Sequence, residues 1–334
     1  MFFKNKKVLI LGGTGTIGTS LVKQILKENP SVIRIFSRDE YKQFNLQNEI
    51  GQRENLRFLI GDIRNYDRVL SAMSDIDYVF HTAAMKHVSS CEYNPYEAVL
   101  TNIVGTNNVI KAAIAQNVKK VVFTSSDKAI SPTNNYGATK LTAERLITSA
   151  EYSKGTAKTI FSSVRFGNVI GSRGSVVPLF KRQILNQKKV TVTDLSMSRF
   201  MMTLNQATEL TIKALKESKG GETFVLKMPV ILLKDLLFVV MEETCKEYHL
   251  NYEEIEIQEI GLRPGEKMYE ELMTFDESTF ALELTDMFLI PSNFGNLNLY
   301  QNAYKAPQGT YSSENQEPIS KEEVCQLLKS EGLI

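Results

Sequence analysis

The chain has 334 residues, of which 43% are hydrophobic and 23% are charged, and its formal net charge is +1. This length allows a large buried core and is long for one compact unit, so we expect two lobes. The near-neutral charge provides no basic field for nucleic acid or for an anionic membrane, and we expect neither as a partner.

The cysteines and the first residues bear on the compartment. Cys91, Cys245 and Cys325 are far apart and form no CxxC motif, which favours a reducing compartment and no structural metal site. The apolar run near the N-terminus is too short for a signal peptide or a membrane span, and it leads directly into a glycine motif. We therefore expect a cytoplasmic protein.

The glycine motif lies between a predicted strand and a predicted helix. Residues 7–11 are a short apolar run, the sequence GGTGTIG follows, and a helical pattern comes next. Gly12 permits a tight turn, Gly15 lets backbone N–H groups approach a pyrophosphate, and Gly18 lets helix and strand pack closely. This context favours a dinucleotide site over an ordinary glycine-rich turn.

The end of the second predicted strand, residues 32–36, indicates which dinucleotide binds. A site for NAD usually places a carboxylate here to hold the ribose 2′-hydroxyl. This chain has Ser37 and Arg38 instead, a hydroxyl and a guanidinium that suit the 2′-phosphate of NADP. Asp39 comes one or two residues late and leaves NAD as the less favoured alternative.

Further strands alternate with helical stretches. Residues 56–62, 78–84, 120–123 and 158–165 have strand patterns, and a helix is predicted over residues 98–116. This alternation predicts an α/β fold with a doubly wound parallel sheet of the Rossmann type.

Several residues near the strand ends are expected to contact the cofactor. Asp62 is placed to accept from the adenine amino group, and the small Ala83 and Ala84 let the backbone approach the cofactor closely. Asn102 is expected to brace the backbone near Lys140. The full set of expected cofactor contacts is Gly12, Thr14, Gly15, Thr16, Ile17, Gly18, Ser37, Arg38, Asp62, Ile63, Ala83, Ala84, Lys86, Asn102, Tyr136 and Lys140.

The segment from Thr124 to Lys140, TSSDKAISPTNNYGATK, carries the candidate catalytic groups. Tyr136 and Lys140 are one helical turn apart on one face, where an ammonium favours the phenolate. Ser126 precedes them, and Asp127 and Lys128 form an adjacent acid and potential base. The Tyr/Lys spacing is weak evidence alone, because such pairs are common on solvated helix faces.

The pattern changes after residue 165. A glycine-rich polar stretch is followed by mixed short elements: helices near 177–185 and 206–217 and strands near 190–193 and 223–226. We expect an NADP-binding domain over residues 1–166, with segments from about 195–228 returning to it, and a smaller α+β substrate lobe with a tail over 167–334. The tail over 292–317 is predicted to be irregular, with a last helix over 321–329 packing on the surface.

The smaller lobe supplies donors for an anionic ligand. The turn over residues 261–267, GLRPGEK, carries both charges, and Arg263 with Arg199 and Asn168 offers hydrogen-bond donors for a diphosphate. Glu266 is placed to hold a ribose. His87 is expected to line the substrate or to be structural rather than catalytic. The full set of expected substrate contacts is Lys86, His87, Asn168, Val176, Arg199, Arg263 and Glu266.

In order along the chain, these motifs resemble those of the extended short-chain dehydrogenases/reductases. The resemblance rests on GGTGTIG, TNIVGT, YGATK and RPGEK and covers most of the chain. It is closer to bacterial nucleotide-sugar 4,6-dehydratases of the polysaccharide-biosynthesis group, through FSRDE, TAAMKHV, SSDKAISPTNNYGATK and RFGNVIGSRGSVVPLF. Most retaining hexose enzymes have Asp-Glu where this chain has Asp127-Lys128. Asp-Lys resembles the C5-inverting UDP-N-acetylglucosamine enzymes, although Ser126 stands where Thr is usual.

The resemblance implies a hydro-lyase mechanism with NADP as a recycled cofactor. Tyr136 takes the proton of the sugar O4 while hydride leaves C4, Lys140 lowers the tyrosine pKa and contacts the cofactor ribose, and Ser126 positions O4. Lys128 then removes the C5 proton and Asp127 protonates the departing C6 hydroxyl. Hydride returns to C6, and a proton delivered from the opposite face inverts C5. The product would serve bacterial surface-glycan or nonulosonic acid synthesis.

The elimination requires a neutral lysine and a protonated aspartic acid. We expect burial under the sugar and nearby positive charges to lower the pKa of Lys128, and the titrations of Asp127 and Lys128 to be coupled. The alternative without a catalytic role is that Asp127 and Lys128 form a solvated ion pair in a surface loop.

Other functions use parts of the same pattern. A 4-epimerase or simple reductase needs Tyr136 and Lys140 but has no use for the Asp127–Lys128 pair. A silent NADP-sensing regulator keeps the glycine loop but has no reason to retain the catalytic groups. The nucleotide of the substrate is open between UDP and GDP. Relatives form dimers or hexamers, so a homo-oligomer is expected.

Overall fold

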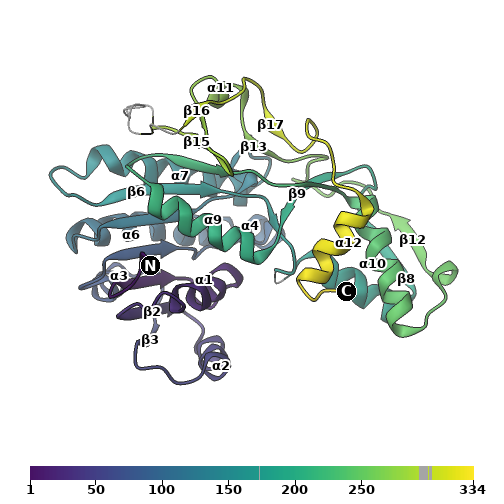
Figure 1. Ribbon diagram of the computed structural model, residues 1–334, viewed down its shortest axis with the longest axis horizontal. Coiled ribbons are helices and arrows are strands. Elements are labelled where there is room, and N and C mark those ends of the chain that lie inside the picture. Colours follow the sequence, from purple (N-terminus) through teal and green to yellow (C-terminus); the bar gives the residue numbers. More distant parts are fainter. Residues whose placement is uncertain (173, 293–299, 301–302) are drawn as a thin grey trace.

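A large sheet with a parallel core organises the computed structural model, which describes residues 1–172, 174–292, 300 and 303–334 (Figure 1). The parallel strands lie in the order β3-β2-β1-β4-β5-β6-β10. Antiparallel β15, β14 and β16 extend the sheet beyond β10. The strand bounds are β1 (Lys7–Leu11), β2 (Val32–Ser37), β3 (Leu56–Ile60), β4 (Tyr78–His81), β5 (Lys120–Thr124), β6 (Ile160–Arg165), β10 (Thr223–Leu226), β14 (Leu282–Glu283), β15 (Met287–Ile290) and β16 (Tyr304–Lys305).

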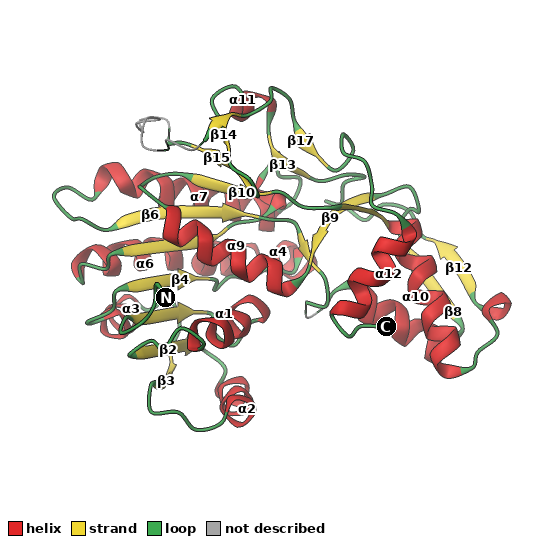
Figure 2. Ribbon diagram, viewed as in Figure 1, coloured by secondary structure: helices red, strands yellow, loops and turns green. Residues whose placement is uncertain are grey.

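Both faces of this sheet are buried under helices, as the continuous apolar runs predict. In β1, Val8 and Ile10 belong to the core beneath α1 (Thr16–Leu26), while Leu9 and Leu11 belong to the core on the opposite face. Helix α9 (Leu204–Glu217) packs beside α1, and α3 (Tyr66–Met73), α6 (Gly105–Ala115) and α7 (Asn135–Ser153) cover the other face (Figure 2). The predicted doubly wound α/β fold is confirmed.

The helix predicted over residues 98–116 is present, but it is not α-helical throughout. It consists of α5 (Pro95–Ala98), a wider π-helical stretch η1 (Val99–Val104) and then α6. Residue 102 lies in the π-helical stretch, which changes the face presented by the residues on either side of it.

The second region packs its own core around α8 (Val176–Gln187), α10 (Leu233–Tyr248) and α12 (Lys321–Ser330). Helix α12 is the predicted last helix, and Val324 and Leu328 bury one of its faces. Short strands form three further sheets: β7 (Asn168–Val169), β9 (Ser198–Met202) and β11 (Val230–Leu232) in one, β8 (Lys189–Val192) with β12 (Glu256–Glu259), and β13 (Glu271–Met273) with β17 (Tyr311–Ser312). Leu272, Met273 and Tyr311 of the last pair belong to the core of the large sheet.

The chain crosses between the two regions more than once. Strand β10 lies beside β6 in the large sheet, so α9 and β10, both within the predicted returning segment, lie with the first region. Strand β9 instead pairs with β7 and β11. The division near residue 166 stays a prediction. Part of the predicted irregular tail, 293–299 and 301–302, lies outside the described residues, as does residue 173.

Candidate active site

The turn between β1 and α1 has no room for side chains at two of its glycines. Gly12 has a φ of +81°, and a Cβ there would lie 2.8 Å from the backbone nitrogen of Ala83. A Cβ at Gly18 would lie 2.3 Å from the carbonyl oxygen of Gly12. Gly15 is the N-cap of α1, and no side chain caps that helix start. The turn therefore fits the pyrophosphate of a dinucleotide at a helix N-terminus.

The end of β2 places polar groups where the adenosine ribose is expected. The Ser37 hydroxyl accepts from Gln43 at 3.0 Å. The Asp39 carboxylate caps α2 (Glu40–Ile50) by accepting from the backbone of Lys42. Arg38 is exposed, with its guanidinium 3.7 Å from Asp62. Asp39 is thus committed to a helix cap, while Arg38 extends toward solvent.

Other expected cofactor residues line the ends of β3 and β4. Asp62 accepts from the backbone and guanidinium of Arg64, which fixes its carboxylate. Ile63 is buried, and Ala83 adjoins the glycine turn. The remaining expected contacts in this region are Thr14, Thr16 and Ile17 at the start of α1 and Ala84 and Lys86 beyond β4.

Asn102 joins the loop after β4 to helix α7. Its side chain accepts from the backbone nitrogen of Met85 at 2.8 Å and donates to the carbonyl of the same residue at 3.0 Å. It also donates to Thr139 on α7 at 3.0 Å. This is the expected bracing role, and a direct contact of Asn102 with the cofactor stays a prediction.

The candidate catalytic segment begins with the short helix η2 (Asp127–Ala129), which packs on the start of α7. Asn134 caps α7 by accepting from the backbone of Gly137 at 2.8 Å. A Cβ at Gly137 would lie 2.1 Å from the carbonyl oxygen of Lys128, so only glycine allows this approach. The close packing brings Tyr136 against η2, and Ser126, Asp127 and Tyr136 are all buried.

Lys128 lies between two carboxylates. Its Nζ is 3.2 and 3.1 Å from the two carboxylate oxygens of Asp127 and 3.4 Å from Glu270. Burial acts to lower the pKa of Lys128, but the charges of Asp127 and Glu270 outweigh it and raise the pKa above its ordinary value. The expected lowering of this pKa is therefore wrong for the protein without its ligands, because a second carboxylate faces the ammonium.

Tyr136 and Ser126 complete the cluster. The Ser126 hydroxyl donates to Asp127 at 2.6 Å and also forms a hydrogen bond with the Tyr136 phenol. Burial raises the pKa of Tyr136 to about 12, and the hydrogen bond with Ser126 and the charge of Lys128 oppose this rise. Tyr136 is thus a protonated phenol in contact with groups that favour its ionisation.

Lys140 has a different environment. Its Nζ donates to the carbonyl of Thr124 and lies 4.0 Å from the ring centroid of Phe123. Burial lowers its pKa to about 7, with only partial opposition from Glu144. Beneath it, His81 is fully buried, and burial together with the Lys140 charge lowers the histidine pKa to about 3. The Lys140 amine is therefore close to its titration point at neutral pH.

The expected substrate residues come from several elements. Asn168 lies on β7, and Val176 is the first residue of α8. His87 precedes α4 (Val88–Tyr93), and its ring lies 3.1 Å from the position of a Cβ built on Gly174. Lys86 and His87 are exposed.

Arg199, Arg263 and Glu266 surround the predicted diphosphate turn. Arg199 donates to the carbonyls of Ser198, Lys267 and Met268, so its guanidinium is bound to the chain that follows the turn. Arg263 is exposed, and its backbone donates to Glu266 at 3.2 Å. These contacts bring the three side chains into one region, and their roles toward a ligand stay predictions.

Sequence reasoning missed Glu270, which is only 5% exposed and contacts both Lys128 and Arg199. Burial and the charge of Asp127 raise the pKa of Glu270, while Lys128 and Arg199 oppose the rise. The only sequence signal for it is its place three residues after the predicted turn.

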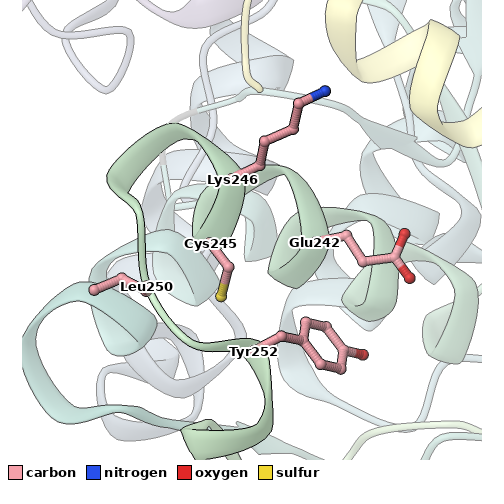
Figure 3. Close-up of a pocket in the computed structure, with 5 residues that line it drawn as sticks. All are labelled: Glu242, Cys245, Lys246, Leu250 and Tyr252. Atoms are coloured by element: carbon pink, nitrogen blue, oxygen red, sulfur yellow. The ribbon is translucent and has the colours of Figure 1, made fainter.

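A hollow of about 440 Å³ lies elsewhere, beside α10 and η3 (Tyr252–Glu254) (Figure 3). It is lined by Glu242, Cys245, Lys246, Leu250 and Tyr252, and none of these is a predicted site residue. Within the described part of the chain, every helix is too short or too polar to cross a lipid bilayer.

Comparisons with known proteins place this geometry in a family. The sequence profile of the polysaccharide biosynthesis protein family matches residues 8–292. The chain is 47% identical, over 98% of its length and 96% of the relative, to a Methanocaldococcus jannaschii protein described as an uncharacterized membrane protein. It is 38% identical to an inverting UDP-N-acetylglucosamine 4,6-dehydratase of Campylobacter jejuni, with 94% of both covered. It is 37% identical to a UDP-glucose 4-epimerase of Rickettsia rickettsii, with 98% and 96% covered.

Solved structures agree with this placement. Pen from Bacillus thuringiensis is 68% identical, with 100% of both chains covered and a TM-score of 0.95. DesIV, a dTDP-glucose 4,6-dehydratase from Streptomyces venezuelae, is 16% identical with a TM-score of 0.72 over 97% of this chain and 96% of its own, a likeness of fold alone. The chain therefore belongs to the polysaccharide biosynthesis protein family and is an enzyme of the nucleotide-sugar dehydratase and epimerase group of extended short-chain dehydrogenases/reductases.

Proposed function

We propose that this enzyme is a UDP-N-acetylglucosamine 4,6-dehydratase that inverts C5 and uses NADP as a recycled cofactor. One observation carries the proposal: a largely buried Asp127–Lys128 pair lies beside Tyr136 and Ser126. An oxidation at C4 needs only the tyrosine. An elimination across C5 and C6 also needs an acid and a base, which this pair supplies.

The cofactor side of the site supports NADP. The bound nicotinamide supplies a reversible hydride acceptor for C4 and donor for C6. Gly12, Gly15 and Gly18 would hold its pyrophosphate, as their closely packed turn allows. Arg38 would pair with the 2′-phosphate, and the use of Asp39 as a helix cap leaves that carboxylate committed elsewhere.

Tyr136 would take the proton from the sugar O4. Its phenol is buried, so ionisation requires compensating charge. The charge of Lys128 already favours the phenolate in the resting protein. Lys140, whose pKa is about 7, would add a positive charge from the same helix when it is protonated.

The Asp127–Lys128 pair would begin and end the elimination as an ion pair. A proton moved from the Lys128 ammonium to the Asp127 carboxylate, across 3.1 Å, produces a neutral amine and a neutral acid together. The amine then takes the C5 proton, and the acid protonates the departing C6 hydroxyl as water. Both residues return to their resting charges, so the net charge of the pair is the same throughout.

The second candidate is a nucleotide-sugar 4-epimerase, which the Rickettsia relative supports. An epimerase uses the tyrosine but forms no water, so it gives the acid–base pair no task. The choice of UDP over GDP rests on the Campylobacter relative. Assembly as a homo-oligomer and a cytoplasmic location stay predictions.

Product analysis in D₂O tests the proposal. The enzyme as purified is incubated with UDP-N-acetylglucosamine, and in parallel with the GDP sugar and UDP-glucose, and products are followed by NMR. We expect a 6-deoxy-4-keto sugar from the first, with deuterium at C5 and inverted C5 configuration. A product that keeps its C6 hydroxyl and differs only at C4 would replace the dehydratase with the epimerase.

A further inference from the structure

The segment just before β13 is bound along the loop that joins η2 to α7. Thr133 and Asn134 both donate to the carbonyl of Gly265, at 2.9 and 3.0 Å. Lys267 donates through Nζ to the carbonyl of Ile130 at 3.0 Å. Residues 265–267 are therefore held against the loop that joins η2 to α7, although the bonded residues are 132 and 137 positions apart in the sequence.

Glu270 follows this stretch, and both its backbone and its side chain are constrained. Its backbone nitrogen donates to the Ser313 hydroxyl at 3.0 Å, and its carbonyl accepts from the backbone of Ser313 at 2.8 Å. Its carboxylate is 3.4 Å from Lys128 Nζ and 3.6 Å from Arg199 Nε. Glu270 thus presents a fixed negative charge between two cations.

The two cations depend on Glu270 to different degrees. Arg199 also donates to three backbone carbonyls, which satisfy its guanidinium without the carboxylate. Among the described residues, the Lys128 ammonium contacts only the carboxylates of Asp127 and Glu270. If Glu270 served only as a structural partner for Arg199, it would not need to contact Lys128. The contact with Lys128 therefore indicates the role of Glu270.

We propose that Glu270 is a positioning residue for the catalytic lysine: it holds the Lys128 ammonium beside Asp127 in the resting enzyme and sets the pH at which the neutral amine becomes available. This inference rests on the proposed function, in which Lys128 removes the C5 proton. Glu270 itself touches neither substrate nor reacting atoms in this role.

The charged and titratable groups that face Lys128 are Asp127 on its own element, Tyr136 from α7 and Glu270 from the segment before β13. Asp127 and Glu270 together raise the pKa of Lys128 against the effect of burial. Removal of the Glu270 charge would therefore lower that pKa. The neutral amine would then form at a lower pH, while Asp127 would still hold the side chain from the other side.

The test is the pH dependence of C5–H exchange with D₂O, measured by NMR on UDP-N-acetylglucosamine with the native enzyme and Glu270→Gln. At high pH, loss of the Lys128 proton to solvent supplies the neutral amine in addition to the transfer to Asp127, so exchange rises with pH. We expect this rise to move down by about one pH unit or more in Glu270→Gln. The pH dependence of C4 oxidation, followed by nicotinamide absorbance, should stay in place. Glu271→Gln is the matched control, since this half-buried neighbour lies near Lys267 instead, and should move neither curve.

Glu270→Asp provides a second variant that keeps the charge and withdraws it by one methylene. We expect a smaller shift in the same direction, and this variant alone decides the matter if the glutamine protein does not fold. If the native enzyme shows C5–H exchange and the folded variants show the same pH dependence of exchange, the role of Glu270 is overturned. The proposed dehydratase function is unaffected by that result. Normal exchange in Lys128→Ala would instead remove the proposed function, and the role of Glu270 with it.

Discussion

Lys128 and Lys140 belong to one candidate catalytic segment, yet the protein places them in opposite electrostatic environments. Lys128 faces two carboxylates, one of them from the segment just before β13, and its pKa is raised. Lys140 faces a backbone carbonyl and an aromatic ring on the sheet side, and burial lowers its pKa to about 7. Charged partners, rather than burial alone, decide which form each amine takes.

In the proposed mechanism, the two lysines act in different steps, which agrees with this difference. Near neutral pH the Lys128 amine is charged and stores a proton that Asp127 can accept, so the pair is ready for elimination. The Lys140 amine is close to its titration point and, in the proposed mechanism, responds to Tyr136 and to a bound cofactor. In the proposed mechanism, the elimination depends on the segment just before β13, through Glu270, and the oxidation depends on the large sheet, through the surroundings of Lys140.

The largest expected effect separates the two steps. Lys128→Ala should lower the rate of water loss by about 10²–10⁴-fold and remove C5–H exchange, while C4 oxidation persists as reduced nicotinamide absorbance. Tyr136→Phe should block that absorbance altogether. Lys154→Ala, at the far end of α7, is a matched control and should change neither step. Dehydration near the native rate in the Lys128 variant would contradict the assignment.

The second expectation concerns the cost of burying Lys140. Its folded pKa of about 7 lies below the unfolded value near 10.4, so the unfolded chain binds more protons between these pH values. The contribution of Lys140 to the free energy of unfolding therefore falls as the pH falls from about 10 to about 7, and it is constant at lower pH. In the cofactor-free protein, the free energy of unfolding of Lys140→Met relative to that of the native protein should therefore fall by roughly 3 kcal/mol from pH 7 to pH 10.

Urea unfolding at each pH measures this difference. Exposed Lys111→Met on α6 serves as the control, and its difference from native should be flat across the same range. A flat difference for Lys140→Met as well would mean that Lys140 keeps an ordinary lysine pKa.

The cofactor side can be weakened separately. Arg38→Ala should reduce NADP affinity by about 1.5–3 kcal/mol, because a charge-assisted contact is lost, and should leave NAD affinity nearly unchanged. Isothermal titration with both cofactors measures this. Equal binding of NADP by native and variant proteins, or NAD released from the denatured native protein, would argue for NAD instead.

The smallest expected effect is on the substrate side. Arg263 is exposed on the turn connected to the catalytic loop, and Arg263→Ala should raise KM for the nucleotide sugar by about tenfold with kcat little changed. Steady-state kinetics measure both constants. A fall in kcat at constant KM would indicate that the turn acts on Lys128 through its connection to the loop rather than on the nucleotide.

The sequence predicted the features that depend on short spacings. The glycine turn, the parallel strands and the Ser126–Lys140 segment are local patterns whose geometry follows from strand ends and helix periodicity. Glu270 was missed because its contact with Lys128 is set by tertiary folding between distant segments. The raised pKa of Lys128 in the protein without its ligands was missed for the same reason.

The π-helical stretch at Val99–Val104 was also missed, since helix propensity does not reveal one extra residue in a turn. The position of β10 beside β6 depends on a chain return that no local pattern encodes.

Direct titration of the two amines is the most decisive measurement. Protein labelled with ¹³C and ¹⁵N at lysine allows the side-chain Cε and Nζ signals to be followed by NMR, with Lys128→Ala and Lys140→Met giving the assignments. We predict that the Lys140 signal titrates with a midpoint of about pH 7 and that the Lys128 signal shows no titration up to about pH 10. Titration of both amines together near the ordinary lysine value would contradict the separation of their roles.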